Sequence, residues 1–218
     1  MKLLPLLGLA AAALAQQYSA PPSDEALGVS DGRGGFYSVS NRKDEGPPYF
    51  QVTKLASNGG VRWNAAFNPG VAAWATAVAV DREGSLLVAG TFWNGAQRDI
   101  LVVKFASTGN LQWRQVYSSG GNSVPTVAVA DPDGNLYVAA TVSEEEGSYL
   151  RVVRLSPGGG VYWGQVWRGG RTNYARALLI DRGGNALAVV ESATSDGRQG
   201  TYQTRQVMFT TAGAVQVQ

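Results

Sequence analysis

The chain has 218 residues, of which 44% are hydrophobic and 16% charged, with 28 glycines and neither cysteine nor histidine. This composition is typical of one globular domain with a sizeable core and without disulfide bonds. The lack of histidine excludes Ser-His-Asp and Cys-His catalysis and histidine-ligated metal sites. The net charge of +2, without a basic stripe, gives no reason to expect nucleic-acid binding.

The N-terminal residues 1–15 (MKLLPLLGLAAAALA) start with the basic Lys2, continue as an apolar run and end in Ala13-Leu14-Ala15. This pattern predicts a secretory signal peptide that is cleaved after Ala15. The apolar run is shorter than the ~20 residues that cross a bilayer, and no other stretch is as apolar, so no membrane span is expected after cleavage. We expect a secreted or periplasmic protein whose residues 16–23 form a flexible lead-in.

The rest of the chain, residues 24–218, is dominated by a repeat with a step of 50 residues. The recurring residues are four aspartates, four glycines three positions later, and three tryptophans: Asp31, Asp81, Asp131 and Asp181; Gly34, Gly84, Gly134 and Gly184; Trp63, Trp113 and Trp163. A period of this size indicates a solenoid or a propeller. We place the four repeats at about residues 24–73, 74–123, 124–173 and 174–218.

The second repeat shows what each unit contains. Four strands are expected, over residues 76–80, 85–92, 100–105 and 111–117. The middle two are continuous apolar runs, which predicts burial on both faces. Tight turns that contain glycine are expected between the first and second strands (Asp81–Gly84) and between the third and fourth (Ser107–Asn110). The expected fold is therefore all-β, a β-propeller of four four-stranded antiparallel blades.

The units AVDREGSLLVAGTF…DILVVKFASTGNLQW and AVADPDGNLYVAATV…YLRVVRLSPGGGVYW resemble the bacterial β-propeller repeats called SBBP repeats. They are more distantly similar to NHL and quinoprotein-like propeller repeats. The resemblance extends from about Ala26 to Val217. It implies the fold and export, whereas propellers of this kind have many different functions.

The fourth repeat is atypical, because Ser192–Gly200 lengthens one loop and Val217 replaces the repeating tryptophan. Two assemblies are compatible with four blades. The favoured one is a monomer whose four blades close on themselves, and the alternative is a homodimer that completes a larger ring.

The repeating aspartates are interpreted as turn residues, because a catalytic residue has no reason to recur in every unit. Asp131-Pro132-Asp133-Gly134-Asn135 has part of the pattern of a calcium loop but lacks the later ligands, so no metal site is predicted. The repeating tryptophans are expected to pack between blades, with the indole N–H donating to a backbone carbonyl.

The loops separate into two classes. The tight turns, alike in all repeats, fall on one face of a propeller, and the loops that differ between repeats fall on the other. Function is commonly carried by variable loops on a common scaffold. The aromatic and arginine residues expected on this variable face, and named as candidate ligand-binding residues, are Trp74, Trp93, Arg98, Trp167, Arg171 and Tyr174.

The function expected from these features is that of an exported propeller that binds an unknown protein, peptide or glycan. No cofactor and no catalytic residue is predicted, and the protein is expected not to be an enzyme. Two alternatives stay open: a hydrolase or lyase with paired carboxylates in the central funnel, and a purely structural component of the cell envelope.

Overall fold

The computed structural model describes residues 26–193 and 202–217. Blade 1 consists of β1 (Leu27–Ser30), β2 (Phe36–Arg42), β3 (Tyr49–Leu55) and β4 (Val61–Phe67). Blade 2 consists of β5 (Ala73–Val80), β6 (Leu86–Trp93), β7 (Arg98–Phe105) and β8 (Leu111–Tyr117). Blade 3 consists of β9 (Asn122–Ala130), β10 (Leu136–Glu144), β11 (Gly147–Leu155) and β12 (Val161–Trp167). Blade 4 consists of β13 (Thr172–Ile180), β14 (Ala186–Ala193), β15 (Tyr202–Phe209) and β16 (Val215–Val217).

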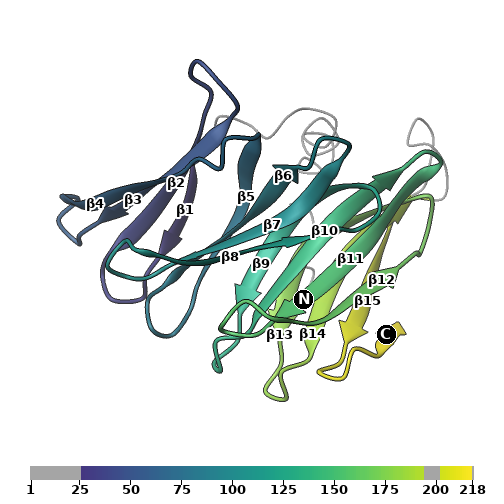
Figure 1. The fold of residues 1–218 in the computed structure, drawn as a ribbon. Coiled ribbons are helices and arrows are strands. Elements are labelled where there is room, and N and C mark those ends of the chain that lie inside the picture. The colour runs from purple at the N-terminus through teal and green to yellow at the C-terminus, as the bar shows by residue number, and fades with distance from the viewer. Residues whose placement is uncertain (1–25, 194–201, 218) are drawn as a thin grey trace.

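Each blade is a separate sheet in which the four strands pair antiparallel in chain order. The prediction of an all-β propeller with four four-stranded blades is therefore confirmed (Figure 1). Within the described residues no helix is long and apolar enough to cross a membrane. The signal peptide, the lead-in and most of the long loop of repeat four are predictions that lie outside the described residues.

The core lies between the blades, since successive sheets pack face to face. Three clusters of buried apolar side chains join blade 1 to 2, blade 2 to 3 and blade 3 to 4. The first of these contains Val52 of blade 1 together with Leu101 and Val103 of blade 2. Strands β6 and β7 of blade 2 are buried on both faces because a neighbouring blade covers each side. This explains their continuous apolar runs.

The four blades form an open arc instead of a closed ring. The inner strands β1, β5, β9 and β13 pack in series, and the described residues show no comparable packing between blade 1 and blade 4. In Figure 1 these two blades lie at opposite ends of the row. The favoured assembly, a ring closed within one chain, is therefore wrong for this structure. A closed ring would need a fourth apolar cluster, and the clusters join successive blades only.

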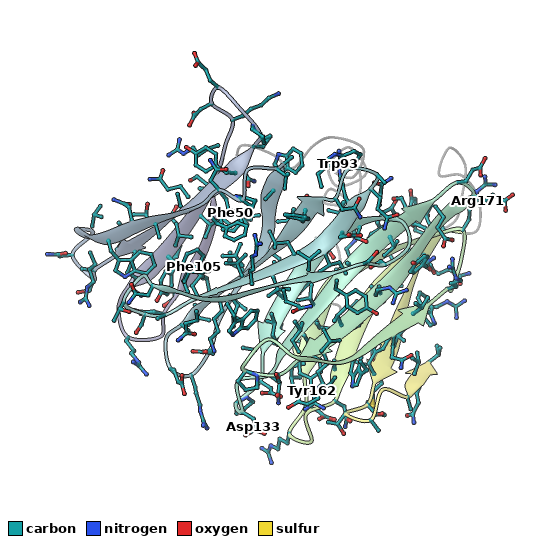
Figure 2. All side chains as sticks on the ribbon, in the orientation of Figure 1. Phe50, Trp93, Phe105, Asp133, Tyr162 and Arg171 are labelled. Carbon is teal, nitrogen blue, oxygen red and sulfur yellow. The ribbon has the colours of Figure 1, made fainter. Side chains whose placement is uncertain are left out.

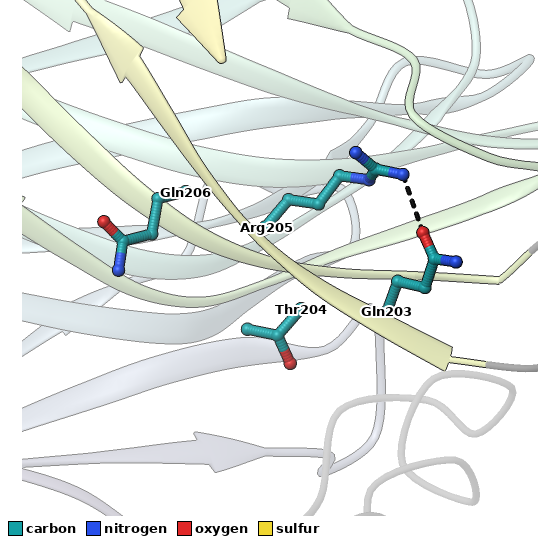
Figure 3. Close-up of a pocket in the computed structure, with 4 residues that line it drawn as sticks. All are labelled: Gln203, Thr204, Arg205 and Gln206. Carbon is teal, nitrogen blue, oxygen red and sulfur yellow. Dashed lines mark hydrogen bonds between the residues drawn. The ribbon is translucent and has the colours of Figure 1, made fainter. Parts of the chain in front are cut away.

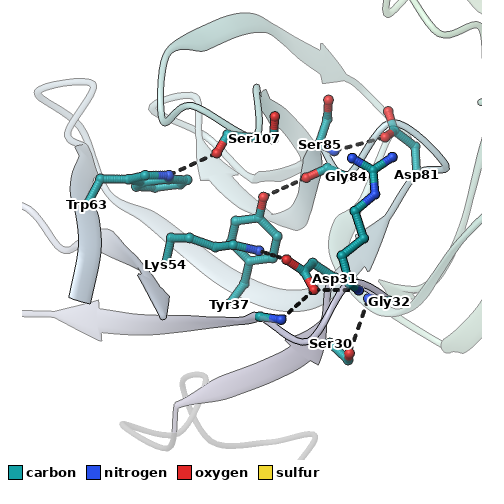
Figure 4. Close-up of polar contacts among 12 residues, drawn as sticks. Ser30, Asp31, Gly32, Tyr37, Lys54, Trp63, Asp81, Gly84, Ser85 and Ser107 are labelled. Atoms are coloured by element: carbon teal, nitrogen blue, oxygen red, sulfur yellow. Dashed lines mark hydrogen bonds and ion pairs between the residues drawn. The ribbon is translucent and has the colours of Figure 1, made fainter. Parts of the chain in front are cut away.

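A tryptophan from the outer strand of each of the first three blades fixes the next blade. The indole N–H of Trp63 donates to the carbonyl of Ser107 at 3.0 Å (Figure 4). The indole N–H of Trp113 donates to the carbonyl of Pro157 at 2.9 Å. Trp163 makes the same bond to Thr211 at 3.0 Å. Gly109 follows Ser107 in this turn and has φ +98°, and a methyl group there would lie 2.9 Å from the Trp63 ring. Glycine is therefore needed here both for the positive φ of the turn and because a side chain would collide with the indole.

The aspartate of each Asp-x-x-Gly turn accepts backbone N–H bonds within its own turn. In blade 1, Oδ1 of Asp31 accepts from the N–H groups of Arg33 at 2.8 Å and Gly35 at 2.7 Å. The other carboxylate oxygen forms an ion pair with the buried Lys54. The hydrogen bond from Lys54 is the main reason that the pKa of Asp31 falls to about 2. Blade 2 repeats the pair at 2.9 Å, between Asp81 and Lys104.

We predict that Asp31→Asn lowers the melting temperature at neutral pH by several degrees. The asparagine keeps the oxygen that caps the turn but leaves the Lys54 ammonium buried without a counter-ion. Since the pKa of Asp31 is lowered in the folded state, its ionised form stabilises the protein above about pH 4, and this contribution is lost as the pH falls to about 2. The difference between variant and wild type in thermal melts should therefore shrink over that interval.

Asp181→Asn is the matched control. Asp181 caps the equivalent turn of blade 4 through the N–H groups of Gly183 and Asn185. Met208 takes the place of the lysine there. A loss as large as that in Asp31→Asn would show that the ion pair is not what stabilises the first turn.

Candidate functional site

The variable face is formed by the β2–β3, β6–β7 and β10–β11 loops together with the connections between blades. Backbone hydrogen bonds tie each loop to a connection: Trp93 N–H to the carbonyl of Ala72 at 2.9 Å, and Ser148 N–H to that of Arg171 at 2.8 Å. Figure 2 shows Trp93 and Arg171 along this edge of the molecule, and Asp133 and Tyr162 along the opposite, tight-turn edge. The loops and connections therefore make one continuous surface.

Three of the candidate residues come together at the end of blade 2, and we call Trp74, Trp93 and Arg98 the blade 2 cluster. Trp93 and Arg98 are cross-strand partners on β6 and β7, so their side chains leave the same face of the sheet. The Arg98 guanidinium lies 5.7 Å from the centre of the Trp74 ring, within the range of a cation–π interaction. Trp93 is 39% exposed, so an aromatic surface faces solvent beside a cation.

A buried carboxylate stabilises the β6–β7 hairpin loop, which joins Trp93 to Arg98. Asp99 is 4% exposed and accepts hydrogen bonds from the side-chain amides of Asn94 at 2.7 Å and Gln97 at 3.0 Å. Asn94 also accepts the backbone N–H groups of Ala96 and Gln97 at 2.9 Å. This network fixes the turn between Trp93 and Arg98, and no feature of the sequence analysis singled it out.

A bulge in β5 positions Trp74. The register between β5 and β6 shifts between Ala75 and Ala77, opposite Gly90. A methyl group on Gly90 would lie only 1.8 Å from the carbonyl oxygen of Trp74. The backbone of Trp74 therefore lies in the space that a side chain on residue 90 would fill.

The other candidate residues do not join this cluster. Trp167 is only 8% exposed and packs in the apolar cluster between blades 3 and 4, so its prediction as a ligand-binding residue is wrong. Tyr174 begins blade 4 on β13 at the position that Trp74 has in blade 2, and Arg171 precedes it in an exposed connection. The backbone of Arg171 is fixed by bonds to Ser148 and Ala193.

A second group of aromatic and charged residues lies on blade 3. Arg168 forms a two-pronged ion pair with Glu144, at 2.9 and 3.0 Å, and its guanidinium lies 4.0 Å from the centre of the Tyr149 ring. The bond from Arg168 lowers the pKa of Glu144. Both partners are about half exposed, so the pair adds little to stability. It links the end of β10 to the connection that leads into blade 4.

The inner strands β1, β5, β9 and β13 carry neither Asp nor Glu. These strands therefore supply no residue for the alternative function, a hydrolase or lyase with paired carboxylates in the central funnel. Within residues 26–193 and 202–217, no three metal-ligating side chains of the Asp, Glu, His and Cys types come together.

Comparison with family models and with curated proteins finds no match. The resemblance to SBBP repeats therefore stays a prediction. Solved structures with a similar arrangement include a Bacteroides caccae protein of unknown function, at 14% identity and a TM-score of 0.47 over 76% of this chain and 52% of that protein. A luciferin-regenerating enzyme matches at 15% identity and a TM-score of 0.44, over 75% of this chain and 52% of the enzyme. Synechocystis apocarotenoid oxygenase matches at 8% identity and a TM-score of 0.48, over 84% of this chain and 46% of the oxygenase.

The chain thus spans about half the length of these proteins. At such identities the likeness concerns the fold alone. Several proteins of similar structure are enzymes by name, and the expectation that this protein is not an enzyme is not upheld. The expectation rested on missing histidine and cysteine, and that composition does not exclude chemistry by other groups.

We predict that Gly90→Ala destabilises the protein by roughly 1–3 kcal/mol, because the added methyl group forces the Trp74 backbone away. Chemical denaturation would measure this loss. Gly158→Ala is the control, since a methyl group there meets nothing within 4 Å, and it should leave stability nearly unchanged. Equal stability of the two variants would show that the bulge does not hold Trp74 in place.

Proposed function

We propose that the protein binds a protein, peptide or glycan through its variable face, and that the blade 2 cluster is the centre of the binding surface. The observation that supports this most is the grouping of two indoles and a guanidinium, with Trp93 39% exposed and Arg98 against the Trp74 ring. Tryptophan and arginine are the residues most enriched among those that dominate binding energy.

The surroundings of the cluster support a preformed site. Arg98 N–H donates to Oδ1 of Asn122 at 3.1 Å, and Gln97 donates to the hydroxyl of Ser118 at 3.2 Å. These bonds join the blade 2 hairpin to the connection that leads into blade 3. A surface whose backbone is already fixed loses less conformational entropy when it binds.

The location predicted from residues 1–15, secreted or periplasmic, agrees with a binding role. An exported protein with a signal peptide meets peptides and glycans outside the cytoplasm. Secretion or periplasmic location therefore stays a prediction, as does the alternative of a structural envelope component.

The test begins with the purified protein on a glycan array and in a peptide phage-display selection. For any ligand so identified, Trp93→Ala and Arg98→Ala should each raise the dissociation constant by about tenfold or more, as residues at the centre of an interface do. The melting temperature should change little, because Trp93 lies at the edge of the sheet and is 39% exposed.

Two controls locate the effect. Tyr162→Ala removes an exposed aromatic ring from the tight-turn edge, where Tyr162 is 57% exposed (Figure 2). Arg171→Ala removes a cation from the same face but from the connection before blade 4. Both should bind as the wild type does. Unchanged binding in Trp93→Ala and Arg98→Ala would contradict the proposal, and so would a ligand that depends on Tyr162.

A further inference from the structure

Among residues 26–193 and 202–217, the open arc leaves one sheet face without a neighbouring blade at each end. We call the face of each blade that packs on the following blade its front, and the face that packs on the preceding blade its back. The same names are used for the two end faces. The back of blade 1 and the front of blade 4 occupy the positions that a neighbouring blade covers elsewhere.

The back of blade 1 carries an apolar row near its tight turns. Phe36 is 42% exposed, whereas the residues at the equivalent positions, Leu86, Leu136 and Ala186, are fully buried. Leu55, its cross-strand partner on β3, is half-buried. The repeat therefore places large apolar side chains here, and only the missing neighbour leaves them in contact with solvent.

The front of blade 4 carries a matching row at the same height. Leu187 pairs with Leu179 on one side and with Met208 on the other, so the three side chains lie across β13, β14 and β15 on one face. Leu179 is 57% exposed. Leu187 is half-buried, whereas its equivalents Tyr37, Leu87 and Tyr137 are at most 1% exposed.

Both faces turn polar toward the variable loops. On the back of blade 1, Ser38 pairs with Thr53 and Ser40 with Gln51. The equivalent positions of blade 2 are Val88, Val103, Gly90 and Leu101. A sheet that packed on the back of blade 1 would therefore meet hydroxyl and amide groups there instead of apolar side chains.

On the front of blade 4, the polar residues are Thr204, Gln206 and the Glu191–Arg176 ion pair. Figure 3 shows Thr204 and Gln206 on the other side of β15 from Arg205 and Gln203, which bond to each other at 2.6 Å. The two uncovered faces therefore share one layout, apolar near the tight turns and polar near the variable loops.

We propose that the front of blade 4 packs on the back of blade 1 of a second copy of the chain. Because every copy has both faces, two copies related by a two-fold axis cover all four ends and close a ring of eight blades. Aligned as in the internal interfaces, the row of Leu187 meets the row of Phe36. Gln206 has the position of Val52, which belongs to the same apolar cluster as Leu101 and Val103, so it faces the positions of Gln51 and Thr53.

The contact between copies is weaker than an internal one. The front of blade 4 differs from the other front faces at three positions. It has Val217 instead of tryptophan, Met208 instead of lysine or arginine, and Leu187 instead of tyrosine or leucine. Val217 cannot donate the indole hydrogen bond to the next turn. Leu187 cannot donate a hydroxyl bond of the kind that Tyr137 makes to the carbonyl of Gly184 at 2.6 Å. The dimer should therefore form reversibly.

Sedimentation velocity over a wide range of protein concentration tests the proposal. The expected result is a concentration-dependent shift from the mass of one chain to twice that mass. A single-chain mass at every concentration would overturn it, and so would a series of growing oligomers, since the two-copy ring has no free ends.

Two matched double variants then test the face. Gln51→Glu with Gln206→Glu places like charges against each other across both contacts and should raise the dissociation constant of the dimer at least about tenfold. Gln51→Lys with Gln206→Glu places opposite charges there and should keep the dimer. Gln206 is exposed and Gln51 is not fully buried, so thermal melts of both variants should match the wild type at a concentration where all are monomeric. A dimer that persists equally in the two variants would show that it forms through another surface.

Discussion

Everything in this fold depends on the contact between one blade and the next. Each sheet of the interior is apolar on both faces, and a single sheet cannot cover itself. The tryptophan at the outer strand fixes the height and distance of the next blade through one directed bond, from Trp63 to the Ser107 carbonyl and its two equivalents. Apolar packing supplies most of the free energy of the interface, and the indole bond specifies the register.

This arrangement also separates scaffold from site. The residues that connect blades, such as Tyr37 and Trp63, lie near the tight turns, where the repeats are alike. The opposite edge is therefore free to differ between blades. At that edge blade 2 has gained Trp74, Trp93 and Arg98, and the carboxylate of Asp99 holds the loop between them.

The period of 50 residues was sufficient to predict the number of blades, their strand order and the two classes of loop, because a repeat must make the same contacts each time. Other features depend on contacts that a period does not contain. Trp167 was expected on the variable face with the other aromatic residues, but the packing of blade 4 buries it. The Asp31–Lys54 ion pair joins residues 23 positions apart, in the turn after β1 and on β3, and only the sheet brings them together. Closure failed as a prediction because it depends on packing between blade 1 and blade 4, a contact that the period does not contain.

The most direct test of this account is hydrogen exchange of the six tryptophan indoles by ¹⁵N NMR, with each signal assigned by a Trp→Phe variant. The account predicts slow exchange for Trp63, Trp113 and Trp163, which bond to the next blade, and fast exchange for the half-exposed Trp93. If those three indoles exchanged as fast as that of Trp93, the blades would not be joined in the way described.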